Sequence, residues 1–248
     1  MNVVYALWLR QIKRYVRSRA RMVASLGQPV LFLLALGFGM GPIFQKAGQG
    51  NYIQFLAPGV IAMTILFTAV FSGIELIWDR QFGFLKETLV APVPRLLIMT
   101  GRVLGGATTA VIQGLIVVVV CLIAGLHISD PSGLPLAALF MALIAVLFTA
   151  LGTAIASVMT DFQGFQLVMN FLVMPIFFLS GALFPLTNLP KMLNLLATID
   201  PLSYGVDGLR GSLTGAVHFG AATDLIVLAV VVACLIVAGS YLFSKIEL

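Results

Sequence analysis

The chain has 248 residues, of which 60% are hydrophobic and only 9% are charged, with a formal net charge of +5. A soluble domain of this size could not keep so much apolar surface out of water, so the composition excludes a soluble globular protein. With so few charged residues, the placement of the basic ones along the chain matters more than their sum, and nucleic acid is not an expected partner. The sequence predicts one all-α integral membrane domain over residues 1–248.

Residues 1–21 form the first predicted element, a basic amphipathic helix that lies in the membrane interface. Four arginines repeat at helical spacing on one face, while Trp8 lies among apolar residues on the other face and anchors the helix at the boundary. The arginines are Arg10, Arg14, Arg17 and Arg21. The alternative is a basic tail that sets the topology without forming a defined helix.

Six apolar segments follow, each near or above the length of about 20 residues that crosses a bilayer core. They cover approximately residues 22–44, 55–78, 96–126, 134–159, 162–184 and 225–243. Gly101 and Gly105, four residues apart in the third segment, would let another helix approach closely. Asp161 is expected to cap the fifth segment after a short turn.

The basic residues predict the orientation of these spans. If the N-terminus is cytoplasmic, 11 basic residues lie on the inner side and 3 on the outer side. The three outer residues are Lys46, Lys191 and Arg210. Because cytoplasmic loops carry the excess of lysine and arginine, both termini are expected in the cytoplasm, in an inner or plasma membrane.

Residues 79–95 gather charge between two apolar spans, so this stretch is expected in water on the cytoplasmic side. Phe82, Leu85 and Leu89 recur at helical spacing, which indicates a short amphipathic helix. Pro92 and Pro94 end it, and a new helix is expected to begin near Arg95. Such a helix suits docking into a groove of a partner protein, and an ordinary solvated loop is the alternative.

Residues 185–224, before the last span, are too polar to cross the membrane and too apolar to lie fully in water. One amphipathic helix face can be traced from Leu189 to Ile199, and Pro201 fits the first turn of a second helix. These features predict two short re-entrant helices that dip into the outer leaflet. A plain extracellular loop is the alternative.

Few residues indicate a catalytic, nucleotide-binding or metal-binding site. The chain lacks a phosphate-binding GxxxxGK[ST] loop, and His127 and His218 lie outside any cluster with metal-ligand spacing, so neither a nucleotide, a metal nor an enzyme active site is expected. Glu75 and Asp79 are one helical turn apart. They belong either to an inner gate or cation relay or, as we favour, to the water boundary.

Aromatic and methionine side chains in the spans allow two interpretations. They could line a substrate path, or they could face lipid or pack in the core. The residues in question are Phe67, Phe71, Met174, Phe177 and Phe178.

Two stretches resemble the ABC-2 type export permeases, the family that includes daunorubicin-resistance and nodulation-factor exporters. The run RQFGFLKETLVAPVPRLLIMTGRVLGG is similar to the cytoplasmic coupling region of that family. The run FLVMPIFFLSGALFPLTNLPKMLNLLATIDPLSYGVDGLR is similar to its fifth span and outer re-entrant pair. One departure is Asp200, where the family often has asparagine.

The resemblance implies a permease that dimerises, with itself or with a related chain, and recruits two copies of a separate ATPase subunit, which binds ATP and Mg²⁺. It implies export of an amphipathic substrate such as a drug, lipid or glycolipid. By analogy, six residues would sit in the ATPase groove: Arg80, Gly83, Phe84, Lys86, Glu87 and Leu89. The alternatives are a self-sufficient secondary transporter or channel, and a membrane assembly factor without transport.

Overall fold

Helices are the regular elements of this protein. The computed structural model describes residues 3–46, 50–84, 93–187 and 190–244, and these ranges contain no strand. Six segments within them are long and apolar enough to cross a membrane, which confirms the predicted all-α membrane fold with six spans. The segments are Met22–Lys46, Tyr52–Gln81, Arg95–Ile123, Pro131–Val158, Phe162–Leu179 and Ala221–Phe243.

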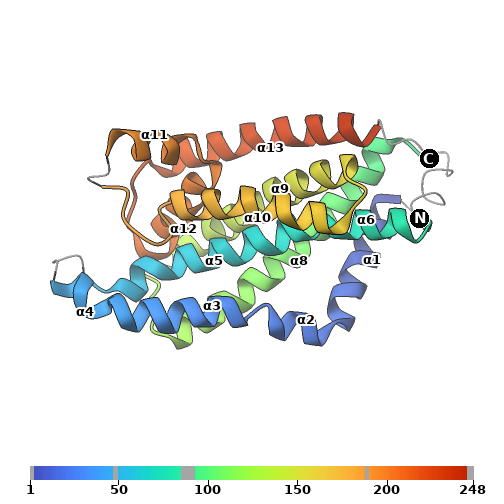
Figure 1. Ribbon diagram of the computed structural model, residues 1–248. Coiled ribbons are helices and arrows are strands. Elements are labelled where there is room, and N and C mark those ends of the chain that lie inside the picture. The colour runs from blue at the N-terminus through green and yellow to red at the C-terminus, as the bar shows by residue number, and fades with distance from the viewer. Residues whose placement is uncertain (1–2, 47–49, 85–92, 188–189, 245–248) are drawn as a thin grey trace.

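The N-terminal helix α1 (Val3–Arg17) is a separate element that turns away from the first span (Figure 1). It ends before Ser18, so the predicted helix over residues 1–21 is interrupted there. The chain then continues through a row of short helical pieces: α2 (Arg19–Ala24), α3 (Gly27–Phe32), the π-helical segment η1 (Leu33–Phe38) and α4 (Gly39–Lys46). Whether α1 lies in the membrane interface stays a prediction.

Helix α5 (Tyr52–Phe71) is the centre of the bundle. Its span is 72% buried, against 11% for the last span, because the other helices surround it. Helix α6 (Ile74–Gln81) continues the same span after a break at Ser72 and Gly73. A Cβ atom on Gly73 would lie 2.5 Å from the carbonyl oxygen of Gly152, so glycine at this position allows α6 to pack closely against α9.

The next three helices begin where the sequence predicts helix starts. Helix α8 (Arg95–Ile123) follows Pro94, as predicted. Helix α9 (Leu134–Val158) follows the short 3-10 turn η2 (Pro131–Gly133). Helix α10 (Phe162–Leu179) is capped by Asp161, whose carboxylate accepts a hydrogen bond of 2.6 Å from the Gly164 amide, as predicted.

Two short helices occur in the region predicted to be re-entrant. Helix α11 (Lys191–Ile199) is exposed, whereas α12 (Pro201–Thr214) is buried against α5, α9 and α13 (Ala221–Ser244). Asp200 caps α12 by accepting a 2.9 Å hydrogen bond from the Leu202 amide. Figure 1 shows α11 and α12 at the opposite end of the bundle from α1 and α6. Their depth in a membrane stays a prediction.

Candidate functional site

A buried ion-pair network joins three helices at the α1 end of the bundle. Asp79, near the end of α6, accepts hydrogen bonds from Arg10 of α1 at 2.8 and 3.3 Å and from Arg102 of α8 at 2.7 Å. The side chains of Asp79 and Arg102 are only 7% and 6% exposed, whereas that of Arg10 is 36% exposed. A buried carboxylate between two guanidinium groups has its charge balanced and its oxygens bonded, which makes burial tolerable.

Glu75 lies one turn before Asp79 and, like Asp79, faces α1. Its carboxylate accepts a 3.3 Å hydrogen bond from Gln11 and lies 3.9 Å from the Arg14 guanidinium. We call Arg10, Gln11, Glu75, Asp79 and Arg102 the carboxylate junction. Glu75 and Asp79 are only 8% and 5% exposed, so neighbouring helices cover both carboxylates. Whether they lie at the depth of the water boundary, as we favoured from the sequence, stays a prediction. The sequence did not show that α1 covers them.

Two glycines explain how α1 comes close enough for these contacts. A Cβ atom on Gly101 would lie 3.1 Å from the Cβ of Leu7, and one on Gly105 would overlap the Gln11 side chain. The close helix approach that this glycine pair indicates is therefore made by α1. Trp8 adds a hydrogen bond of 3.0 Å from its indole nitrogen to the Thr108 hydroxyl.

Residues just after Asp79 connect the junction to α9 and to the coupling region. Arg80 donates hydrogen bonds to the carbonyl oxygens of Met159 and Ser157, at 3.0 and 3.2 Å. Gly83 has a φ of +77°, a conformation that glycine adopts without strain, and the chain turns there. The Phe84 ring then lies 3.8 Å from the Arg10 guanidinium. The predicted ATPase-contact residues Lys86, Glu87 and Leu89 lie outside the described residues.

The remaining arginines of the predicted interfacial helix lie beside the junction. Arg14 stands 5.4 Å from the Trp78 ring, and Arg17 is exposed at the edge of an open groove between α1 and the end of α6. The side chain of Arg21 lies outside the part of the chain that the structure describes.

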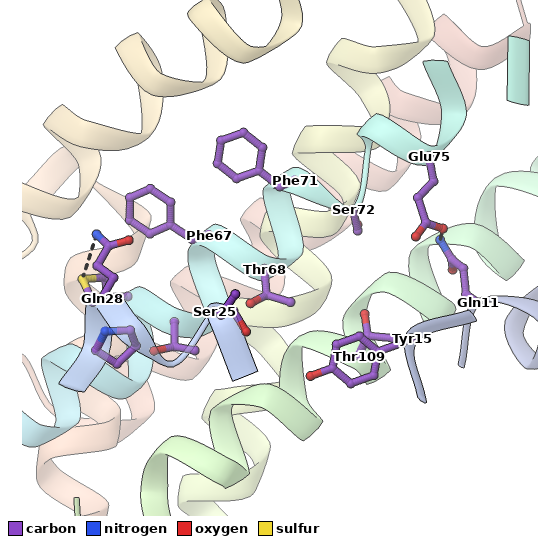
Figure 2. Close-up of a pocket in the computed structure, with 14 residues that line it drawn as sticks. Gln11, Tyr15, Ser25, Gln28, Phe67, Thr68, Phe71, Ser72, Glu75 and Thr109 are labelled. Carbon is purple, nitrogen blue, oxygen red and sulfur yellow. Dashed lines mark hydrogen bonds between the residues drawn. The ribbon is translucent and has the colours of Figure 1, made fainter. Parts of the chain in front are cut away.

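A cavity of about 350 Å³ begins at Glu75 and extends along α5 toward α3. Figure 2 shows polar side chains from α1, α5 and α8 around it, with Phe67 and Phe71 on α5 and Gln28 on α3. Its lining residues are Gln11, Tyr15, Ala24, Ser25, Gln28, Pro29, Met63, Thr64, Phe67, Thr68, Phe71, Ser72, Glu75 and Thr109.

The structure brings some of the predicted path residues together and separates others. Phe67 and Phe71 stack with centroids 6.3 Å apart, and Phe177 of α10 meets Phe67 edge to face at 6.5 Å. Together with Glu75, Phe67 and Phe71 line the cavity. Met174 and Phe178 do not line it and are 39% and 46% exposed on α10.

Arg210 of α12 makes contacts that the sequence did not predict, since the basic-residue pattern placed this residue only on the outer side. Its guanidinium donates hydrogen bonds to the carbonyl oxygens of Gly181, at 2.9 Å, and Phe55, at 3.3 Å, and lies 4.0 Å above the Phe55 ring. Burial lowers the pKa of Arg210 to about 10, so the side chain remains charged at neutral pH. Arg210 thus holds α12 against α5 and the end of α10.

No group of three or more histidine, cysteine, aspartate or glutamate residues with metal-binding geometry occurs among the residues that the structure describes.

Comparison with known proteins identifies the family. The model of the ABC-2 type transporter family matches residues 2–214. The transport permease ycf38 of Porphyra purpurea is 33% identical over 84% of this chain and 72% of its own length. Nodulation protein J of Rhizobium leguminosarum bv. trifolii is 29% identical, over 85% and 80% of the two chains. The inner membrane transport permease YadH of Escherichia coli (strain K12) is 28% identical, over 85% and 82%. The chain therefore belongs to the ABC-2 type transporter family and is a multi-pass membrane transport permease.

Proposed function

We propose that this chain is the membrane subunit of an ATP-binding cassette exporter that moves an amphipathic substrate, such as a drug, lipid or glycolipid, out of the cell. The energy comes from ATP hydrolysed by a separate subunit, and this chain binds neither ATP nor Mg²⁺ itself. The observation that carries the proposal is the carboxylate junction, which ties Asp79, the first residue of the coupling region, to α1 and α8 in a chain of the ABC-2 family.

The junction gives a mechanical route from the coupling region into the bundle. A displacement of residues 80–89 is transmitted directly to Asp79, because Asp79 and Arg80 are adjacent at the end of α6. From Asp79, two charged hydrogen-bonded contacts lead to α1 and α8, and from Arg80 two more lead to the end of α9. Charge-assisted hydrogen bonds are short and directional, so we expect the connected helices to move as one body.

The complete transporter contains two copies of the ATPase subunit and a second permease, either the same chain or a related one. The ATPase binds from the cytoplasm over Arg80, Gly83, Phe84, Lys86, Glu87 and Leu89. Helix α1 and the end of α13 lie at the same end of the bundle as α6 (Figure 1), which supports the proposal that the coupling region and both termini share one compartment. The excess of basic residues at that end favours the cytoplasmic side of an inner or plasma membrane.

Affinity capture of the tagged chain from its native membrane in a mild detergent tests the proposal. A co-purifying protein with a phosphate-binding loop and ATPase activity is expected. Glu87→Arg should remove that protein from the complex, because a reversed charge in the docking helix opposes its groove. Asp130→Arg, a charge reversal at the other end of the bundle, is the matched control and should retain it. Capture of the chain alone, or equal capture by both variants, contradicts the proposal.

A further inference from the structure

Helix α10 exposes amide side chains within a membrane span. Gln163, Gln166 and Asn170 are exposed, and none of these side chains has a hydrogen-bond partner among the residues that the structure describes. Asn170 lies midway along α10. Hydrocarbon offers an amide neither a donor nor an acceptor, so lipid tails are a poor environment for this face.

The outward faces of the other long helices suit lipid better. Every exposed residue of α8 and α9 is leucine, isoleucine, valine, alanine or proline. Between Asp224 and Ser240, α13 exposes isoleucine, valine, alanine and Cys234. Only 22% of the α10 span is buried within the single chain, so its amide face is open for contact. A protein partner is therefore expected on α10 and not on α8, α9 or α13.

The exposed residues of α10 recur with the spacing of a coiled-coil seam. Four of them follow one another at intervals of four, three and four positions, which places them in one row along the helix. We call them the α10 row: Gln163, Leu167, Asn170 and Met174. Leu167 and Met174 are 71% and 39% exposed. Such a row packs against a second helix at the shallow left-handed crossing that is common in membrane bundles.

A second copy of this chain fits the α10 row because the row is complementary to itself. Two copies in one membrane share their orientation, so a two-fold axis along the membrane normal lays the two α10 helices side by side and parallel. Each residue of the row then meets its counterpart. A primary amide both donates and accepts, so two Asn170 side chains can form reciprocal hydrogen bonds. Because α10 contains no ionisable residue, the approach brings no like charges together.

We propose that the α10 row is the contact surface between two copies of this chain, with the paired Asn170 amides fixing its register. A single asparagine in the seam of a parallel coiled coil sets register and oligomeric state in the same way. Formation of this dimer does not require the ATPase. Only its place in the transporter rests on the proposed function.

Oxidative cross-linking of the full chain in membranes tests the proposal. Cys234→Ala removes the exposed native thiol, and Cys121 is buried. In this background Leu167→Cys places a thiol in the α10 row, and Val237→Cys places an equally exposed one, at 71%, on α13. Both positions lie within about two helical turns of the same end of the bundle (Figure 1), so they are matched in depth as well.

Two copies with different tags are expressed together and oxidised with copper phenanthroline. We expect a disulfide-linked dimer that carries both tags from Leu167→Cys and at most a trace from Val237→Cys. A Leu167→Cys product that contains a different protein, no product at all, or equal cross-linking of Val237→Cys overturns the proposal.

A second measurement tests the amide pair. Energy transfer between labelled copies, followed as the membrane is diluted with lipid, gives the monomer–dimer equilibrium. Asn170→Leu should weaken dimerisation about three- to tenfold, the value of hydrogen bonding between membrane helices, whereas Asn170→Gln keeps the amide and should retain most of the affinity. An equilibrium unchanged by Asn170→Leu overturns the role of the amide pair. Absence of an ATPase partner would refute only the proposed function.

Discussion

Asp79→Asn removes the negative charge at the centre of the carboxylate junction while nearly conserving the side-chain volume. Arg102, with a side chain 6% exposed, then loses its ion-pair partner in the protein interior, whereas Arg10, 36% exposed, can turn toward water. Removing one partner of a buried ion pair costs about 3–5 kcal/mol. For a chain of 248 residues this lowers the unfolding midpoint by on the order of 10 °C.

The two tryptophans allow a fluorescence assay that reports on unfolding near the carboxylate junction. Trp78 precedes Asp79, and Trp8 is hydrogen-bonded to α8, so intrinsic fluorescence during heating in detergent reports on the junction directly. Asp130→Asn is the matched control, because it removes the same charge from an exposed turn. Arg10→Gln should cost only about 1 kcal/mol, since its partner retains Arg102. A midpoint for Asp79→Asn within about 2 °C of the Asp130→Asn value would refute the reasoning.

Three further predictions concern other parts of the molecule. Gly152→Ala should destabilise the protein by about 1–3 kcal/mol, because the new Cβ would overlap the Val70 carbonyl oxygen, whereas Gly39→Ala has open space and should be neutral or stabilising in the same thermal assay. Burial raises the pKa of Asp200 from its ordinary 3.8 to about 7, so the folded state retains this proton more tightly than the unfolded state. Stability should therefore fall by at most about 4 kcal/mol between pH 4 and pH 7, and Asp200→Asn, which keeps the helix cap, should flatten that part of the stability–pH curve; an unchanged curve would contradict the assignment. Lys191→Cys should react with membrane-impermeant thiol reagents in intact cells, and reaction only after permeabilisation would overturn the predicted topology.

The fold followed from the sequence wherever a local signal existed. The long apolar runs predicted six spans because a bilayer core sets the helix length. Pro94 and Asp161 predicted helix starts because both residue types fit the ends of helices and not their interiors. These signals require no knowledge of which helix lies next to which.

The junction and the cavity could not be predicted because they depend on contacts between distant segments. Asp79 and Arg102 are 23 residues apart and Asp79 and Arg10 are 69 apart, and their charges alone suggested the water boundary. The glycine pair in α8 indicated a close helix contact, but not that α1 makes it. Gln11 showed no signal at all, because a single glutamine in a basic amphipathic helix is ordinarily a solvated residue.

The central claim is that a separate ATPase drives this permease. Native mass spectrometry of the complex captured from the membrane tests this claim most directly. The account predicts an assembly with two permease chains and two copies of an ATPase subunit that carries a phosphate-binding loop. A stable, transport-competent assembly that contains only this chain would contradict it, and would favour a self-sufficient carrier.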